Sequence, residues 1–452
     1  MKMSNRQLPP GLGGYLAFNP EDIKENPLGF YRRMWQEYGD LVRLPILPNY
    51  CVYIAVHPNY IEHILSTHQE RYSKPDLFKK PMNMMAGESI LTSEGDFWLK
   101  HRRLMQPAFH MKQLTNLAIA MVSCTKSLVQ EWEKKPDGEV IDIASETLRL
   151  TLKIAGLTLF STDISDDSSS LGKAFRTGFE FVNYKMNNLV TPPLWFPTPR
   201  NFRFRQSKQT LDNLVQEIIN SRRQNPVDSP DLLSMLMAAK DEETGEGMSD
   251  EQLKNEAITL LIAGHETVAS ALSWTWYLLG KNPDIAANIQ DELGKVLNGN
   301  NPTFEKLPQL DYTRRVFEES LRLYPPAWAL PRVSLEDDEI EGYFIPKGAI
   351  VTLAKYVTHR HPEFWEKPDE FNPDNFLLEK VNQRPKFAYF PFGGGQRICI
   401  GKSFAVMEAT IIMAIVSQHF KLELVNSHPV EIDPRFTLHP KYGIKVKLWK
   451  RS

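Results

Sequence analysis

Cysteine is scarce in this chain, and its spacing excludes several kinds of site. Three cysteines, Cys51, Cys124 and Cys399, occur in 452 residues, and no Cys-x-x-Cys pair is present. A disulfide framework, a cysteine-built zinc site and a ferredoxin-type cluster therefore do not fit. A reducing, intracellular compartment is the natural expectation for such a chain.

Long apolar runs and an excess of one charge are also lacking. No run approaches the roughly 18 apolar residues that cross a bilayer, and no apolar core of a signal peptide is found. The formal net charge is −2, so nothing global favours a nucleic-acid partner. We therefore expect a cytoplasmic protein with no membrane span and no nucleic-acid partner.

The chain does have length and apolar content, because 42% of its residues are hydrophobic. The pattern from 95 to 295 is mostly helical, and another helix is expected from 401 to 419. Short strand-like runs lie at 40–44, 51–56 and 331–352. With no repeat and no long linker, we expect a mainly α fold with a small β-rich part, in a single domain over residues 1–452.

One segment, Phe392-Gly-Gly-Gly-Gln-Arg-Ile-Cys-Ile-Gly401, is more informative than any other. It places Cys399 in a glycine-rich loop, with Arg397 two residues before it and Gly393 near its start. A lone thiolate on such a loop can bind a metal whose other ligands come from elsewhere, and a porphyrin iron with four ring nitrogens fits. The alternative is a buried structural cysteine beside a flexible loop.

The longest predicted helix contains the segment Ala263-Gly-His-Glu-Thr267. Ala263 and Gly264 leave one helix face without side-chain bulk, and Thr267 can donate to the carbonyl of Ala263. Glu266, if it faces inward, can pass protons. The alternative is a glycine-weakened helix with an exposed glutamate. Ser249 and Gln252 predict a capping box at the start of this helix.

Two weaker patterns concern charged side chains on helices. Glu319 and Arg322 are three residues apart, share a helix face and can pair. Trp98 and Arg102 are one turn apart, so an indole N–H and a guanidinium can together bind a carboxylate. Arg332 is a further cation suited to that task.

In this order and spacing the motifs resemble those of cytochrome P450, from Pro9 to Pro440. The cysteine segment resembles the family's haem-binding loop, and Ala263–Thr267 is similar to its oxygen-binding groove. Glu319 and Arg322 resemble its structural Glu-x-x-Arg pair. The helix that carries Trp98 and Arg102 is similar to the helix that binds the haem propionates.

The resemblance implies the P450 fold and haem b, with the Cys399 thiolate as axial ligand. It implies that Thr267 steers protons to bound oxygen and that Glu266 is the acid beside it. The implied haem-binding residues are Cys399, Arg397, Phe392, Gly393, Gly401, Trp98, Arg102, Arg332 and Ala263. One departure is Asn375, where the family usually has an arginine paired with the Glu-x-x-Arg residues, so a rearranged network is expected there.

The implied function is a monooxygenase that inserts one oxygen atom from O2 into a C–H or C=C bond. Its substrate would be a hydrophobic small molecule such as a fatty acid, terpenoid or steroid, and the Ala-Gly-His-Glu-Thr sequence is similar to that of fatty-acid hydroxylases. The candidate substrate-lining residues are Ala263, Thr267, Trp328, Ala327, Met84 and Phe181.

No flavin- or nicotinamide-binding domain is recognised, so we expect no fused reductase. Electrons would come from a separate ferredoxin or flavodoxin with its reductase, which Lys100, Arg103 and Lys402 are placed to dock. The competing functions are a peroxide-driven or redox-neutral haem-thiolate enzyme and a non-catalytic haem sensor. The intact pair of Glu266 and Thr267 favours the monooxygenase.

Overall fold

The computed structural model describes residues 7–17, 19–47, 50–165, 170–188, 191–225, 231–241, 243–434 and 436–451. These residues form two compact units. Unit 1 contains the chain up to Asp76 together with Glu318–Cys399, and unit 2 contains Leu77–Phe317 and the chain from Ile400 onward. The expectation of a single domain stays a prediction.

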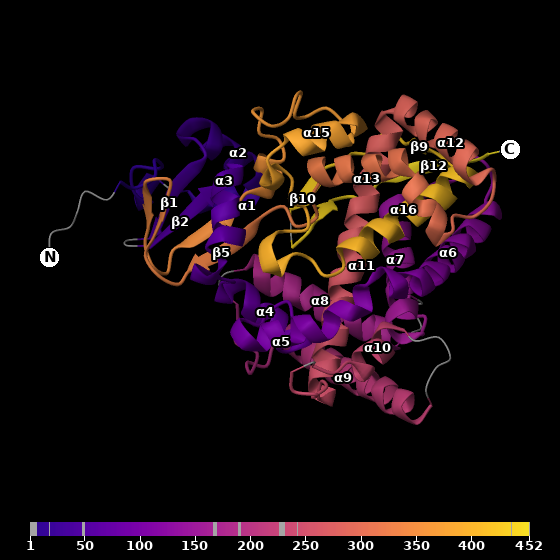
Figure 1. Ribbon diagram of the computed structural model, residues 1–452, viewed down its shortest axis with the longest axis horizontal. Helices are drawn as coiled ribbons and strands as arrows, with labels where there is room; N and C mark the ends of the chain where they lie inside the picture. The colour runs from indigo at the N-terminus through magenta and orange to yellow at the C-terminus, as the bar shows by residue number, and fades with distance from the viewer. Residues whose placement is uncertain are drawn as a thin grey trace. The chain divides into compact units, whose positions relative to one another are not determined.

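Unit 1 carries the main β-sheet and the cysteine loop (Figure 1). Its helices and turns are η1 Tyr15–Ala17, α1 Pro20–Glu25, α2 Pro27–Tyr38, α3 Pro58–Glu62, η2 His63–Thr67, η3 Gln69–Arg71, α14 Lys355–Thr358, η6 Pro373–Phe376, α15 Leu378–Gln383, η7 Lys386–Ala388 and η8 Gly395–Arg397. Its strands are β1 Leu41–Leu47, β2 Tyr50–Ala55, β3 Tyr72–Ser73, β5 Leu330–Ser334, β6 Asp338–Ile340, β7 Tyr343–Ile345 and β8 Ile350–Leu353. The strands predicted at 40–44, 51–56 and within 331–352 are thus confirmed.

The five-stranded sheet of unit 1 has the order β1-β2-β8-β5-β3. β1 and β2 form an antiparallel pair, whereas β2 runs parallel to β8. Alternate side chains point to opposite faces of a strand, so each face has its own core. Tyr53 and Val351 belong to one core cluster, and Val42 and Ile54 pack with Phe30 of α2 in the other.

Unit 2 is mainly helical. Its helices are α4 Asp76–Ala86, α5 Gly95–Met105, η4 Gln106–Phe109, α6 Met111–Glu133, α7 Ile143–Phe160, α8 Ser170–Asn187, α9 Pro199–Gln224, α10 Leu232–Ala238, α11 Asp250–Lys281, α12 Pro283–Leu297, η5 Phe304–Gln309, α13 Asp311–Leu323, whose last turns belong to unit 1, and α16 Lys402–His419. Its strands are β4 Val140–Asp142, β9 Phe420–Leu424, β10 Ile432–Pro434, β11 Leu438–Pro440 and β12 Lys445–Lys450. The expected mainly α fold with a small β-rich part is confirmed.

α11 is the central helix of unit 2 and contacts α7, α9, α12, α16 and β11 (Figure 1). Its start is fixed by the predicted capping box, in which Ser249 and Gln252 each accept a hydrogen bond from the other's backbone N–H. It has 32 residues, which gives a length of about 48 Å at 1.5 Å per residue. Among the described helices, none is both long and apolar enough to cross a membrane.

Candidate active site

α11 is buried along most of its length, yet the small-residue segment is accessible. Ala263 is exposed and Gly264 and Thr267 are half-buried, whereas their neighbours are buried. Oγ1 of Thr267 donates to the carbonyl of Ala263 at 2.7 Å, which confirms the predicted back-bond. A Cβ built on Gly264 meets no atom within 4 Å. This face of the helix can therefore be covered by a flat ligand.

Glu266 is buried on the same helix, so the alternative of an exposed glutamate is wrong. Its Oε1 accepts a hydrogen bond from Oγ1 of Thr437 at 2.9 Å and lies 2.5 Å from Nε2 of His439. Its Oε2 is buried and has no hydrogen-bond partner among the described residues. Oε1 is thus held in place by two side chains, whereas Oε2 can form a further hydrogen bond.

The neighbouring His265 is buried and neutral. Burial, aided by the positive charges of His439 and Arg176, lowers the pKa of His265 to about 3. Its ring makes an edge contact with Phe175 of α8, with centroids 5.5 Å apart. His265 therefore packs α11 against α8 and does not exchange protons near neutral pH.

α5 presents Trp98 and Arg102 one turn apart, as predicted. Trp98 is buried, and Nε of the half-buried Arg102 donates to Oε1 of Gln106 at 3.3 Å. Between them, Nδ1 of the buried His101 lies 2.6 Å from Oε1 of Glu256. Since Glu256 belongs to α11, this contact fixes the orientation of α5. Sequence reasoning missed it because the partners are 155 residues apart.

The cysteine loop of unit 1 is a tight turn that only glycine can form. Gly393 and Gly395 have φ of +74° and +64°, a region that favours glycine. A Cβ on Gly395 would lie 1.7 Å from the carbonyl oxygen of Leu65. The N–H of Cys399 donates to the carbonyl of Phe392 at 2.9 Å and closes the loop. Cys399 is exposed, so the alternative of a buried structural cysteine is wrong.

The buried Lys355 contacts the start of this loop. Nζ of Lys355 donates to the carbonyl of Pro391 at 2.9 Å. Burial lowers the pKa of Lys355 to about 7, while a Cys399 thiolate raises it and Arg332 lowers it. A positive charge on Lys355 favours the ionised sulfur of Cys399. Arg332 was a predicted site residue, but Lys355 was missed, and no local motif marks it.

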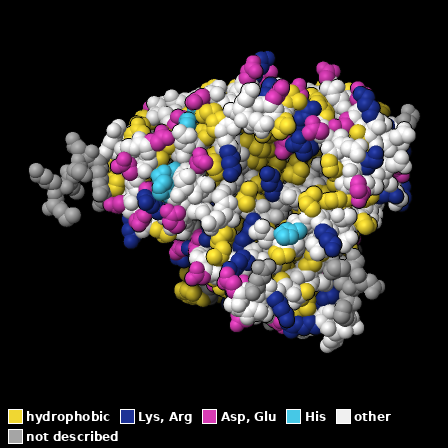
Figure 2. Space-filling model, in the orientation of Figure 1, with side chains coloured by type: hydrophobic (Ala, Val, Ile, Leu, Met, Phe, Trp, Pro, Cys, Tyr) yellow, Lys and Arg dark blue, Asp and Glu magenta, His cyan; other side chains and the backbone are white. Residues whose placement is uncertain are grey.

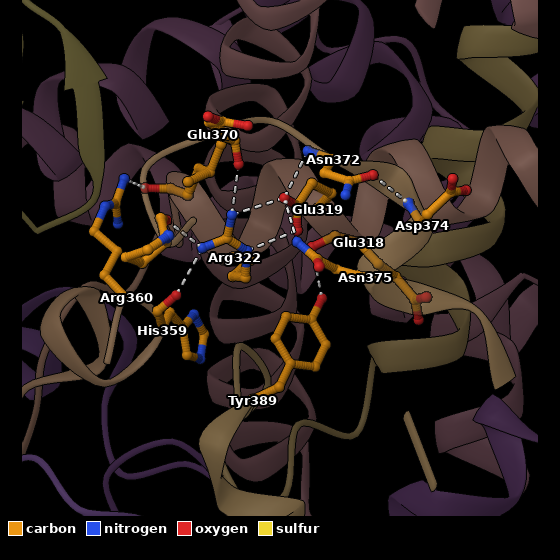
Figure 3. A network of polar contacts seen from close by, with 12 residues as sticks. Glu318, Glu319, Arg322, His359, Arg360, Glu370, Asn372, Asp374, Asn375 and Tyr389 are labelled. Atoms are coloured by element: carbon orange, nitrogen blue, oxygen red, sulfur yellow. Dashed lines mark hydrogen bonds and ion pairs between the residues drawn. The ribbon is translucent and has the colours of Figure 1, made fainter. Parts of the chain in front are cut away.

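Glu319 and Arg322 form the predicted ion pair, and both are fully buried (Figure 3). Nε and Nη2 of Arg322 each donate to a Glu319 oxygen at 2.7 Å. The remaining donors bind backbone carbonyls, among them those of His359 at 2.9 Å and Glu370 at 2.9 Å. The guanidinium therefore joins α13 to the segments that precede the cysteine loop.

Asn375 occupies its expected place in this network. Its Nδ2 donates to Oε1 of Glu319 at 3.1 Å, and the N–H of Asn372 donates to the same oxygen at 2.9 Å. Near it, Arg384 donates to the carbonyl of Asn375 at 2.6 Å and lies 3.6 Å from the ring centroid of Trp365. The rearranged network predicted for this position is present, with a cation that sequence reasoning did not assign.

His359 connects the ion pair to the loop. Its carbonyl accepts from Arg322, and its Nε2 accepts from the N–H of Phe390 at 3.0 Å. Burial lowers the pKa of His359 well below its usual range, so the ring stays neutral and Nε2 remains an acceptor. Phe390 is two residues before Phe392, where the loop begins, so the buried pair helps to position the loop.

The comparison with protein families covers nearly the whole chain. The family model described as "Cytochrome P450" matches residues 9–448. The chain belongs to the cytochrome P450 family.

Similar proteins include bacterial enzymes of known name. This P450 is 33% identical over 392 residues to cyclooctat-9-en-7-ol 5-monooxygenase of Streptomyces melanosporofaciens. The aligned region covers 86% of this chain and 83% of that protein. This P450 is also 30% identical over 433 residues to pentalenene oxygenase of Streptomyces avermitilis, with 95% and 94% covered. The crystal structure of the cytochrome P450DA heme domain superposes with a TM-score of 0.88 at 26% identity, covering 99% of each chain.

Family membership makes this P450 an oxidoreductase, a monooxygenase that uses haem b with an axial cysteine thiolate. The residues present fit that cofactor. No group of three or more His, Cys, Asp or Glu in the described part of the chain could hold a metal ion alone. A single accessible thiol suits a metal that brings four porphyrin nitrogens with it.

The candidate substrate-lining residues are distributed over both units. In unit 1, Ala327 and Trp328 are half-buried, and Trp328 contacts Tyr31 with ring centroids 5.8 Å apart. In unit 2, Met84 of α4 is half-buried, while Phe181 of α8 is buried. Phe181 stacks on Phe204 of α9 at 4.0 Å, so it already has a packing role. A substrate contact for these residues stays a prediction.

The predicted docking cations are not isolated charges. Lys100 lies 2.7 Å from Glu246, and Arg103 lies 2.6 Å from Glu243. On the face shown in Figure 2, basic and acidic side chains are interspersed. The positive potential around Lys100 and Arg103 is therefore weaker than the sequence indicates, and docking there stays a prediction.

Proposed function

We propose that this P450 hydroxylates a terpenoid, inserting one oxygen atom from O2 into a C–H bond, with Cys399 as the iron ligand. Two of the similar proteins, named for cyclooctat-9-en-7-ol and for pentalenene, act on terpenoids, which favours this class over fatty acids and steroids. In unit 2, the half-buried Met84 is an adaptable apolar candidate for substrate contact, together with Ala263 and Thr267. In unit 1, the proposed substrate contacts are the half-buried Ala327 and Trp328.

The assignment of Cys399 as the iron ligand is supported by its exposure on a glycine-rich loop. Of the three cysteines, Cys399 is exposed, Cys51 is half-buried and Cys124 is buried. Burial also raises the pKa of Cys124 to about 11, so Cys124 stays a thiol. Cys399 has the nearby charge of Lys355, which favours a thiolate. Gly393 leaves no side chain in the way of a flat ring.

When bound, the haem supplies the activation of O2. The chain supplies protons and position: Glu266 holds a proton at its unpaired Oε2, and the hydroxyl of Thr267 receives it and directs it to the oxygen site. Because Thr267 donates to Ala263, its lone pairs remain free to accept. Trp98 and Arg102 of unit 2, and Arg332 and Arg397 of unit 1, would supply donors to the haem propionates. Phe392 and Gly401 would help to hold the haem through the cysteine loop that they bound.

Family members receive electrons from a redox partner. For this chain we propose a ferredoxin or a flavodoxin with its reductase. Lys402 is exposed at the start of α16, directly after the cysteine loop. A cation at that point can attract an acidic partner, although Lys100 and Arg103 share their charge with neighbouring carboxylates.

The test uses purified holoprotein with a surrogate ferredoxin and reductase. Cys399→Ser is expected to abolish the thiolate-type carbon monoxide band of the reduced protein, because an alcohol does not donate charge as a thiolate does. The parent is expected to give a high-spin shift with polycyclic terpene alcohols and to hydroxylate them with O2 and reductant, but not with peroxide alone.

Cys51→Ser is the matched control, since Cys51 is half-buried in β2 of the same unit. It should keep both the spectrum and turnover. An unchanged band in Cys399→Ser would overturn the ligand assignment. Spin shifts and products with long-chain fatty acids alone would overturn the substrate class while leaving the monooxygenase in place.

A further inference from the structure

The buried Glu266 needs a route by which it regains protons, and β11 offers one. Monooxygenation consumes two protons for each O2, so any acid beside the oxygen site must be recharged in every turnover. Glu266 is 3% exposed, whereas the ring of His439 is 28% exposed. His439 therefore contacts both the solvent and the buried carboxylate.

The contact is held rigidly in place. The carbonyl of Leu438 accepts hydrogen bonds from Oγ of Ser270 at 2.5 Å and from Nε1 of Trp274 at 2.8 Å. Both donors belong to α11, so β11 is fastened to the helix that carries Glu266. Thr437 directly precedes β11, and both its hydroxyl and the ring of His439 contact Oε1 of Glu266.

Other groups near Glu266 do not serve as well. His265 is adjacent in sequence but buried and neutral, and its Nδ1 has no partner among the described residues. Thr437 is buried and holds the carboxylate with its hydroxyl. Asp433 lies directly opposite His439 in the β10–β11 register, where a second carboxylate can attract protons to the imidazole.

We propose that His439 is the proton entry for Glu266. Solvent protonates Nδ1 of the ring, and the proton on Nε2 passes to Oε1 of Glu266, which becomes a neutral acid. Rotation of this carboxyl group about its Cγ–Cδ bond then brings the protonated oxygen to the unpaired position, from which Thr267 receives the proton. Tautomer exchange of the ring with solvent restores the Nε2–H form, so one proton enters for each proton delivered. His439 acts through Glu266 and is a positioning residue. The inference rests on the proposed proton role of Glu266.

The test compares His439→Gln with His439→Lys in the haem-loaded enzyme. Glutamine keeps a hydrogen-bond donor but cannot carry a proton, whereas lysine can. We expect His439→Gln to keep the substrate-induced spin shift. We also expect it to lower the ratio of product to reductant about tenfold, less than the roughly 10²-fold or greater contribution of a group that transfers the proton directly, because His439 acts through Glu266. The solvent deuterium isotope effect on the rate of product formation by His439→Gln should be larger than that of the wild type. His439→Lys should recover most of the coupling.

His428→Gln is the matched control, because His428 lies in the same C-terminal segment and its Nε2 contacts the carbonyl of Tyr442 at 3.0 Å. It should leave coupling unchanged. A second measurement does not depend on turnover: in the diamagnetic ferrous carbonyl protein with nitrogen-15 histidine, Glu266→Gln should shift the Nε2 resonance of His439 and leave that of His428 in place.

The outcomes distinguish the proposed entry route through His439 from the proposed proton role of Glu266. If His439→Gln stays coupled while Glu266→Gln does not, the entry route is wrong and the role of Glu266 stands. If both variants stay coupled, Glu266 has no proton role and both proposals fall. An Nε2 resonance of His439 that ignores Glu266→Gln would also overturn the route.

Discussion

Glu319 and Glu266 are both buried, but their hydrogen-bond partners differ. Glu319 has two oxygens occupied by Arg322, and further donors from Asn372 and Asn375 reach one of them. Glu266 has one occupied oxygen, one unpaired oxygen and a partner that reaches solvent. A saturated carboxylate fixes structure, because protonation would break several contacts at once. The unpaired oxygen of Glu266 is the basis of the proton role that we propose for it.

The largest effect is expected from breaking the saturated pair. Glu319→Ala leaves the Arg322 guanidinium buried without its counter-charge, which costs about 3–5 kcal/mol in such pairs. Denaturant unfolding of the holoprotein measures this loss in the free energy of unfolding. Lys24→Ala removes an exposed pair with Glu21 in the same unit and should change stability by less than about 0.5 kcal/mol. Equal effects of the two variants would contradict a structural role for Glu319.

Glu408 of α16 extends the comparison to a buried carboxyl without a partner. Neither oxygen has a hydrogen-bond partner among the described residues, and burial raises the pKa of Glu408 well above its usual value. Below the unfolded-state pKa both states are protonated. Above it only the unfolded state ionises, so the wild type loses stability relative to Glu408→Gln by about 1.4 kcal/mol per pH unit, until the folded-state pKa is reached.

Unfolding of both proteins at pH 5 and pH 7 measures this slope. Glu423→Gln is the control, because Glu423 is exposed on β9. Its difference from the wild type should not change with pH. A difference for Glu408→Gln that is equal at both pH values would show that Glu408 is ionised in the folded protein.

A smaller effect tests how the Glu319 network balances its charge. Burial lowers the pKa of Arg384 to about 10, while the charge of Glu319 raises it and that of Arg322 lowers it. Arg384 therefore brings to Glu319 the positive charge that Asn375 lacks. Asn375→Arg alone should be destabilising, because a third guanidinium then shares one carboxylate. In an Arg384→Gln background the same change should be better tolerated.

A double-mutant cycle in denaturant measures this relation. We expect a favourable coupling energy of about 1 kcal/mol between positions 375 and 384, within the range for neighbouring charged residues. Strictly additive effects would mean that Arg384 acts only through its stacking on Trp365.

The sequence predicted most of what depends on short spacing. The capping box of α11, the back-bond of Thr267 and the pair of Glu319 with Arg322 all join residues three or four apart. The partners of Glu266 were not predicted, because His439 is 173 residues away and only the tertiary fold joins them. Thr437 and His439 are close together in the sequence, but nothing there indicates which helix their segment meets. Lys355, His359 and Arg384 were missed for the same reason.

The close approach of Gly395 to Leu65 has a practical consequence for protein engineering. The same turn is held by Gln69, whose Oε1 accepts from the N–H of Gln396 at 3.1 Å. Libraries that aim to change the sulfur's surroundings need not vary Gly395, where an added Cβ collides with the carbonyl of Leu65. Position 69, more than 300 residues upstream, offers an adjustable contact for that purpose.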